Sequence, residues 1–218
     1  MKKIYLLLVG LTLSVAVQAQ IKVGLKFSPT LASNRVEVDS EELEITSDGV
    51  GGRFVFGPVI DYFFGDNYAF STGLLYAPKR VGLEVNYEPS DPNNPSEILK
   101  DAKEAYALQY LQIPATVKLF TNELALDTRL FFQLGGIAEI KIAEKEKQDE
   151  SIYMESFRPY DFSLHLGAGL EHRMGYNTVL FGGFFYNRGL VNTAGKPVND
   201  IDLTINNDLV GLDLGVKF

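Results

Sequence analysis

The chain has 218 residues, of which 46% are hydrophobic; it has no cysteine and no tryptophan, and its formal net charge is −8. This acidity argues against a nucleic-acid partner, which would require a basic face. The lack of cysteine excludes disulfides, thiol chemistry and cysteine-ligated zinc.

Residues 1–19 have the three-part pattern of a secretory signal peptide. A basic start, "MKK", precedes the apolar stretch "IYLLLVGLTLSVAV", and the small residues of "VQA" favour cleavage after Ala19. The apolar stretch is shorter than the roughly 20 residues of a membrane-spanning helix. We therefore expect a mature chain of residues 20–218, forming one domain with a net charge of −10 once Lys2 and Lys3 are removed.

The mature chain alternates between apolar and polar residues in many places, which is the pattern of β-strands. It predicts eight strands, near residues 20–27, 52–64, 68–79, 106–120, 128–141, 160–173, 178–188 and 208–218. Pro58 removes a backbone donor from the second of these, so a bend or bulge is expected there. A helical turn is conceivable only at 96–108.

The strand at 160–173, "YDFSLHLGAGLEHR", shows the two faces most clearly. One face carries Tyr160, Phe162, Leu164, Leu166, Ala168 and Leu170, and the other carries Asp161, Ser163, His165, Gly167, Gly169, Glu171 and Arg173. The last strand repeats the pattern, with Val210, Leu212, Leu214, Val216 and Phe218 opposite Gly211, Asp213, Gly215 and Lys217. Bulky residues therefore share one face, and glycines and charges share the other.

The connections between these strands alternate between long and short. Long polar segments lie near 28–51, 80–105, 142–159 and 189–207, and together they carry a net charge of −11. Short connections, "GDN", "TNELALD" and "MGYN", follow the even-numbered strands. Transmembrane barrels have this asymmetry, with short periplasmic turns and long extracellular loops.

Two closed folds can use eight such strands, and they differ in which face meets water. A soluble lipocalin-like barrel buries its apolar face, whereas a membrane barrel turns that face to lipid. A narrow eight-stranded interior favours glycine inside and aromatic residues outside. The mixed charges on the glycine-rich face can then pair across the lumen, namely Arg53, Lys118, Arg129, Arg173 and Lys217 with Asp61, Glu139, Asp161, Glu171 and Asp213. Tyrosines near strand ends suggest an interfacial girdle formed by Tyr62, Tyr68, Tyr76, Tyr106, Tyr160 and Tyr186.

The sequence thus predicts an all-β, eight-stranded antiparallel up-and-down transmembrane β-barrel in the outer membrane of a Gram-negative bacterium. It also resembles the outer-membrane β-barrel family of Bacteroidetes that includes PorT. The resemblance rests on "VGLKFSPTLA" after the signal peptide, "YLQIPATVKL" at 110–119, "LGAGLEHRMG" at 166–175 and the ending "DLVGLDLGVKF". It spans nearly the whole mature chain and implies the location and the fold, but it does not transfer the secretion role of PorT.

Asp161, Ser163 and His165 share one strand face and supply the residue types of acyl-transfer chemistry. Neighbours two residues apart on a strand lie roughly 6–7 Å apart, too far for direct hydrogen bonding. We therefore expect a hydrogen-bond network in the lumen, no catalytic residues and no cofactor. His172 points away from His165, which makes a poor metal site.

Three functions remain open. The first is a barrel with a side-chain-filled lumen that acts structurally or through its acidic loops, in adhesion, partner docking or envelope integrity. The alternatives are a lipid-modifying enzyme using Ser163 and His165, and a narrow transporter of small apolar molecules with a lateral opening near Pro58 or Pro114. Expected partners are outer-membrane lipid and lipopolysaccharide, a protein at the extracellular loops, and the barrel-assembly machinery, through the terminal aromatic Phe218.

Overall fold

The computed structural model describes residues 20–39, 43–87, 101–146, 154–197 and 202–218, and its regular elements are all β-strands. Eight long strands form a closed ring, in which β4 and β5 are two halves of one strand interrupted at Leu74. In chain order the ring contains β1 (Ile21–Asp39), β3 (Gly51–Gly65), β4 (Tyr68–Gly73) with β5 (Leu75–Tyr87), β6 (Ala102–Ala125), β7 (Thr128–Glu146), β9 (Tyr160–Met174), β10 (Thr178–Gly189) and β12 (Asp202–Lys217). Three short strands are added to it: β2 (Leu43–Ser47) pairs with β5, while β8 (Met154–Phe157) and β11 (Ala194–Pro197) pair with each other.

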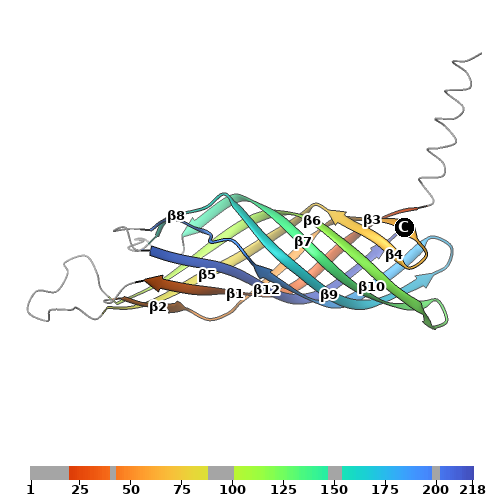
Figure 1. The fold of residues 1–218 in the computed structure, drawn as a ribbon, viewed down its shortest axis with the longest axis horizontal. Coiled ribbons are helices and arrows are strands. Elements are labelled where there is room, and N and C mark those ends of the chain that lie inside the picture. The colour runs from red at the N-terminus through yellow and green to blue at the C-terminus, as the bar shows by residue number, and fades with distance from the viewer. Residues whose placement is uncertain (1–19, 40–42, 88–100, 147–153, 198–201) are drawn as a thin grey trace, which may run out of the picture.

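Each ring strand is antiparallel to its neighbours in the chain, and β1 closes the ring by pairing with both β12 and β3. The closure is completed at the last residue, because the Phe218 N–H donates to the carbonyl of Val23 at 2.8 Å. Figure 1 shows the resulting elongated barrel, with the C-terminus and the tight turns at its right-hand end. Among the described residues, no helix is long and apolar enough to cross a membrane. The predicted up-and-down barrel is confirmed.

The strands are longer than the sequence pattern suggested. Residues 28–39 belong to β1 and 80–87 to β5, although both ranges were predicted to be loop. The helical turn suggested for 96–108 is also wrong where the chain is described, because β6 begins at Ala102; residues 96–100 lie outside the described part. The tight turns at 66–67, 126–127 and 175–177 are short, as expected.

The predicted assignment of faces holds in the half of the barrel that carries the tight turns. On β9, Asp161, Ser163 and His165 are buried, whereas Phe162 and Leu166 are exposed on the outer surface. The exposed apolar side chains on all eight ring strands form an outer belt. Since about 9–11 residues of a tilted strand cross a bilayer, this belt marks the membrane.

Beyond the belt, in the part of the barrel that lies toward the left of Figure 1, the buried inward side chains are apolar. On β6 the outer residues Ile113 and Leu119 are exposed, but further along the strand it is the inward Tyr106 and Leu108 that are apolar and buried. The same inversion occurs on β12, between the outward Val210 and the inward Ile205. The barrel therefore continues outside the membrane as a conventional water-soluble β-structure with an apolar core.

Pro58 marks a weak point in the ladder, but the bulge expected in its own strand is not found: β3 is continuous from Gly51 to Gly65, and its register with β1 has no shift at Pro58. The Leu74 N–H donates to the Pro58 carbonyl at 3.0 Å, but proline has no N–H to return the bond, and the strand assignment breaks between β4 and β5. The register between β4/β5 and β6 places Pro114 and Ile113 across from the same break. Two prolines thus flank Leu74 from its two neighbouring strands.

Candidate functional site

The interior of the membrane-level barrel is filled by charged side chains, arranged in layers along the axis. The layer nearest the tight turns joins Lys118 and Lys217 to Asp61 and Glu171. Lys217 Nζ lies 2.5 Å from Asp61 Oδ2 and also contacts Glu171, while Lys118 Nζ lies 3.1 Å from Asp61 Oδ2. Arg129 adds a contact to Glu171 at 3.3 Å. We call these five residues the periplasmic ion cluster, after the orientation that the loop lengths predict.

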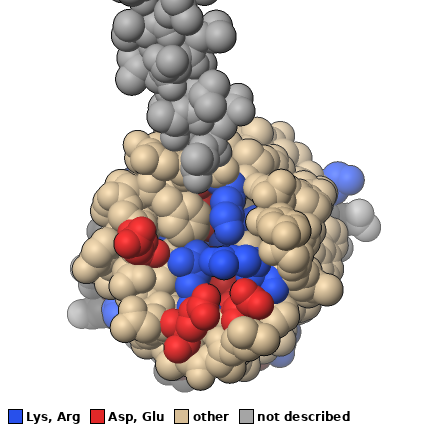
Figure 2. All heavy atoms as spheres, turned by 90° about the vertical axis from the view of Figure 1, so that its right-hand side faces the viewer, with Lys and Arg blue, Asp and Glu red and all other residues tan. Residues whose placement is uncertain are grey.

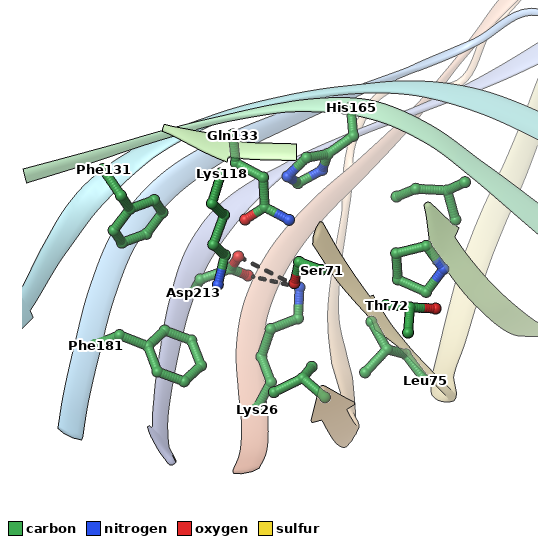
Figure 3. A pocket seen from close by; sticks show the side chains of 13 residues that line it. Lys26, Ser71, Thr72, Leu75, Lys118, Phe131, Gln133, His165, Phe181 and Asp213 are labelled. Carbon is green, nitrogen blue, oxygen red and sulfur yellow. Dashed lines mark hydrogen bonds and ion pairs between the residues drawn. The ribbon is translucent and has the colours of Figure 1, made fainter. Parts of the chain in front are cut away.

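The middle layer combines an ion pair with a small polar cavity. Lys26 Nζ lies 3.1 Å from Asp213 Oδ1, and the Ser28 hydroxyl donates to Asp213 at 2.6 Å. Figure 3 shows this pair with Gln133 and His165 pointing into the same space. The cavity has a volume of about 20 Å³, which suffices for about one water molecule.

The third layer is a buried ion triad of Lys79, Glu139 and Asp161. Lys79 Nζ lies 2.5 Å from Glu139 Oε2 and 3.0 Å from Asp161 Oδ2, and all three side chains are at most 1% exposed. Gln112 donates to Glu139 at 3.2 Å, and Asn207 donates to Asp161 at 3.4 Å. These amides supply further polar partners to charges that would be costly if left unpaired.

Beyond the triad the lumen becomes apolar, which the sequence analysis did not anticipate. We call this set the extracellular core. Its buried members are Ile45, Val81, Leu83, Val85, Tyr106, Leu108, Tyr110, Met154, Phe157, Ala194, Leu203 and Ile205. Met154, Phe157 and Ala194 come from β8 and β11, so the short two-stranded sheet closes this end of the interior. The described part of the lumen thus contains three charged layers, a cluster of buried apolar side chains among them that includes Val59, Phe131 and Phe181, and the extracellular core beyond the triad.

Ser163 and His165 are not arranged as a nucleophile and its base. The Ser163 hydroxyl donates to Glu139 at 3.2 Å, whereas His165 Nδ1 lies 2.6 Å from Asn187 Oδ1. Asp161 contacts neither of them, because its carboxylate is held by Lys79. Both Ser163 and His165 are at most 2% exposed, so a lipid could not reach them. The trio forms parts of two separate lumen networks.

The sequence analysis identified the acidic side chains that form ion pairs inside the lumen, but it identified only some of their basic partners. Glu139, Asp161 and Asp213 each pair with a lysine inside the barrel, but these partners, Lys79 for the first two and Lys26 for the third, were missed. Lys26 lies between the outward Leu25 and Phe27, and this alternation could have identified it, whereas Lys79 lies between Pro78 and Arg80 and gives no such signal. Arg53 was expected to join the network, but its Nη1 donates only to the Gly52 carbonyl.

The outer surface agrees with an interfacial girdle, with one exception. Tyr62, Tyr68, Tyr160 and Tyr186 point outward and are 37–67% exposed. Tyr106 is instead 2% exposed and faces inward, because it lies beyond the level at which the apolar face inverts. Phe218 is 63% exposed on the outer face, beside the periplasmic end.

No group of acidic or histidine side chains among the described residues has the arrangement of a metal site. His172 is exposed and its Nδ1 lies 2.9 Å from the Thr128 hydroxyl. Two of the acidic residues near the first loop, Glu41 and Glu42, lie outside the described residues.

Comparisons with known proteins agree with this architecture. The crystal structure of neisserial surface protein A matches with a TM-score of 0.51 and 14% identity, covering 91% of this chain and 96% of that one. The outer membrane protein OprG from Pseudomonas aeruginosa matches with a TM-score of 0.56 and 13% identity over the same shares. These identities establish a common fold alone. No curated protein matches the chain.

A family model described as "Outer membrane protein beta-barrel domain" matches residues 16–195, which is most of the chain. Together with the lipid-facing belt and the closed ring, this match places the protein in the outer membrane of a Gram-negative bacterium. The chain belongs to the outer membrane protein β-barrel domain family.

Proposed function

We propose that this protein is a closed, non-conducting barrel that works by docking a partner at its extracellular end. The observation that supports this most directly is the filling of the lumen. The triad of Lys79, Glu139 and Asp161 lies below the extracellular core, so an ion entering from outside meets an apolar layer and then paired charges. Neither layer offers a continuous aqueous path.

The extracellular end is built as a stable platform. Tyr106 packs edge-on against Phe157 with ring centroids 5.0 Å apart, and its hydroxyl donates to Glu104 at 2.6 Å. On the outer side, Arg80 pairs with Asp48 at 2.6 Å and so ties β5 to the chain between β2 and β3. A protein that needed only to sit in the membrane would not require such a core beyond the bilayer.

The chemistry of the partner follows from charge. The connecting segments 40–42, 88–100, 147–153 and 198–201 contain eight acidic and two basic residues in the sequence. This composition suits a basic protein surface, since complementary charge speeds association and selects partners. It also suits lipopolysaccharide phosphates bridged by divalent cations.

Planar-bilayer recording tests closure. We expect no stable channel from the purified protein, and a conductance typical of a wide aqueous pore would contradict the proposal. Docking is tested by comparing the adherence of producing cells to polylysine-coated and uncoated surfaces. Changing the eight acidic residues of the connecting segments to their amides should abolish the preference for polylysine, whereas changing Asp66 and Asp127 at the opposite end should not.

One observation favours a second function, the passage of small apolar molecules through the wall. Pro58 and Pro114 both flank the interruption at Leu74, and the polar cavity of the middle layer lies directly behind it, with Thr72, Leu75 and Pro114 in its lining. Because that cavity holds only about one water molecule, passage would need the strands to part. Cysteines at Pro58 and Leu74, oxidised to a disulfide in this cysteine-free chain, should then block uptake of an apolar substrate and restore it on reduction.

The remaining proposals are narrower. Within the family, the motifs quoted above support membership of the PorT-like barrels of Bacteroidetes. The separate networks of Ser163 and His165 support a protein without enzymatic activity. Lipid A from cells with and without the protein should therefore show the same acylation by mass spectrometry.

A further inference from the structure

The periplasmic end of the barrel carries a basic cavity that the docking proposal does not use. Its volume is about 370 Å³, and its lining comprises Gln20, Lys22, Phe63, Phe64, Gly65, Asp66, Arg129 and Arg173. Figure 2 looks onto this end and shows Lys and Arg side chains gathered at its centre, with acidic residues around them. The whole chain has a net charge of −8, so this concentration of cations is opposite to its average.

The cations of this cavity are not fully neutralised by neighbouring carboxylates. Arg173 has its nearest carboxylate oxygen, that of Asp127, at 4.0 Å, and its side chain is 49% exposed. The Lys22 side chain makes no hydrogen bond or ion pair within the described ranges; its Nζ lies 5.7 Å from the Phe63 ring centroid, although the β1–β3 register places Lys22 opposite Asp61. The Asp61 carboxylate is directed inward, where Lys118 and Lys217 hold it.

Arg129 is fixed in position at the floor of the cavity. Its Cζ lies 3.8 Å from the Phe120 ring centroid and 5.3 Å from that of Phe63. One Nη donates to Glu171 at 3.3 Å, and the other makes only a long contact of 3.4 Å to the Asp66 carbonyl. A guanidinium packed against a stacked pair of aromatic rings, Phe63 and Phe120, loses little freedom when it binds an anion, which favours affinity.

The barrel wall and the ion cluster give this cavity a closed floor. The periplasmic ion cluster lies directly behind it, and Glu171 contacts both Arg129 and Lys217. A bound molecule would therefore stay in the cavity at the end of the barrel and would not pass into the lumen. Cleavage after Ala19, which the sequence predicts, would add the α-amino group of Gln20 to the same lining.

We propose that this cavity binds a phosphate-bearing anion through Lys22, Arg129 and Arg173. Two guanidinium groups and an ammonium match the several charged oxygens of a phosphate or diphosphate better than the single charge of a carboxylate. The volume is within the range of small-molecule sites, and it would hold a diphosphate or a sugar phosphate. The phosphate can belong to a soluble periplasmic molecule or to the headgroup of an inner-leaflet phospholipid, since Phe64 lies on the outer rim and is 56% exposed toward lipid.

Calorimetry with inorganic pyrophosphate tests the site, using the full protein in phosphatidylcholine nanodiscs at low salt. We expect saturable binding at one site per barrel that weakens as salt is raised. The double variant Lys22→Gln/Arg173→Gln should weaken binding by about tenfold or more. Arg129 is left unchanged because its packing against Phe120 and its ion pair with Glu171 make its removal a risk to folding.

The matched control is Lys103→Gln/Arg188→Gln, which removes two exposed cations from the opposite end of the barrel. Retention of binding in the control and its loss in the test variant support the proposal. No saturable binding to the wild type, or equal weakening in both variants, overturns it. Heat-modifiable gel migration verifies that both variants are folded.

Nanodiscs containing phosphatidylglycerol separate the two sources of phosphate. Competition of this lipid with pyrophosphate assigns the site to a headgroup, whereas unchanged pyrophosphate affinity assigns it to a soluble ligand. Neither result bears on conductance or on adherence, which report on the other end of the molecule.

Discussion

Lys217 on the last strand reaches over Gly24 of β1 to Asp61 on β3, and their charged atoms lie 2.5 Å apart although 156 residues separate them in the chain. Both side chains are fully buried. This contact links the end of the chain to its beginning and is therefore made only when the ring has closed.

We expect Lys217→Met to destabilise the barrel by about 3–5 kcal/mol, because it leaves Asp61 and Glu171 buried with too little positive charge. Urea-induced unfolding in detergent would measure the loss. The double variant Lys217→Met/Asp61→Asn should recover part of it, since one of the unpaired charges is removed. A double variant as unstable as the single one would show that packing matters more here than charge.

A second prediction concerns the glycines of the lumen wall. A Cβ on Gly169 would lie 2.3 Å from the Gly182 carbonyl oxygen and 2.7 Å from Cα of Gly183, so the β9–β10 ladder would have to shift. Gly169→Ala should therefore lower both the folded yield and the unfolding midpoint. Gly52→Ala is the control, because nothing lies within 4 Å of a Cβ built there. Equal behaviour of the two variants would contradict the close approach of the strands.

The extracellular core can be tested independently of the membrane. Tyr106→Ala removes a buried aromatic side chain and should cost about 3–5 kcal/mol of local stability. Limited proteolysis is expected to cut the extracellular end of this variant, while the membrane-level strands stay protected. Phe184→Ala, at a side chain 76% exposed toward lipid, should leave the protease resistance unchanged. Cleavage in both variants, or in neither, would count against a separate core.

The variant Phe218→Ala tests the proposed role of the terminal aromatic in assembly. The side chain is largely exposed on the outer face and the backbone bonds to Val23 are kept, so the stability of the folded barrel should change little. We expect much less folded protein in the outer membrane of cells, but normal refolding of the purified chain into lipid vesicles. Normal assembly in cells would refute a recognition role.

Local alternation was sufficient to predict the membrane-level fold, because a strand's side chains change face at every residue. Asp161 and Leu166 illustrate this, since each lies on the face that the pattern indicated. The pairs of charged side chains inside the barrel could not be predicted with the same success. Asp161 pairs with Lys79, 82 residues away, and such a pairing depends on strand register, which the alternation leaves open.

The ends of the strands were missed for a different physical reason. At Val36 and Val38 the apolar residues of β1 face inward, whereas at Phe27 and Leu31 they face outward. A search for one continuous apolar face therefore stops where the solvent around the strand changes from lipid to water. The basic cavity at the periplasmic end was missed because Lys22 and Arg173 come together only when the ring closes.

The inversion of the apolar face has an evolutionary consequence. Within a single strand such as β6, replacing an outward Val117 by serine removes a lipid contact, whereas the same change at the outward Ala105 leaves a surface that water already covers. Inward positions should follow the opposite rule, tolerating polar substitutions near Thr116 and rejecting them at Leu108. Each long strand is thus under two opposite patterns of selection, one within the membrane and one beyond it. The position at which natural variants begin to accept polar residues on the outer face and to exclude them from the inner face would locate the membrane boundary from sequences alone.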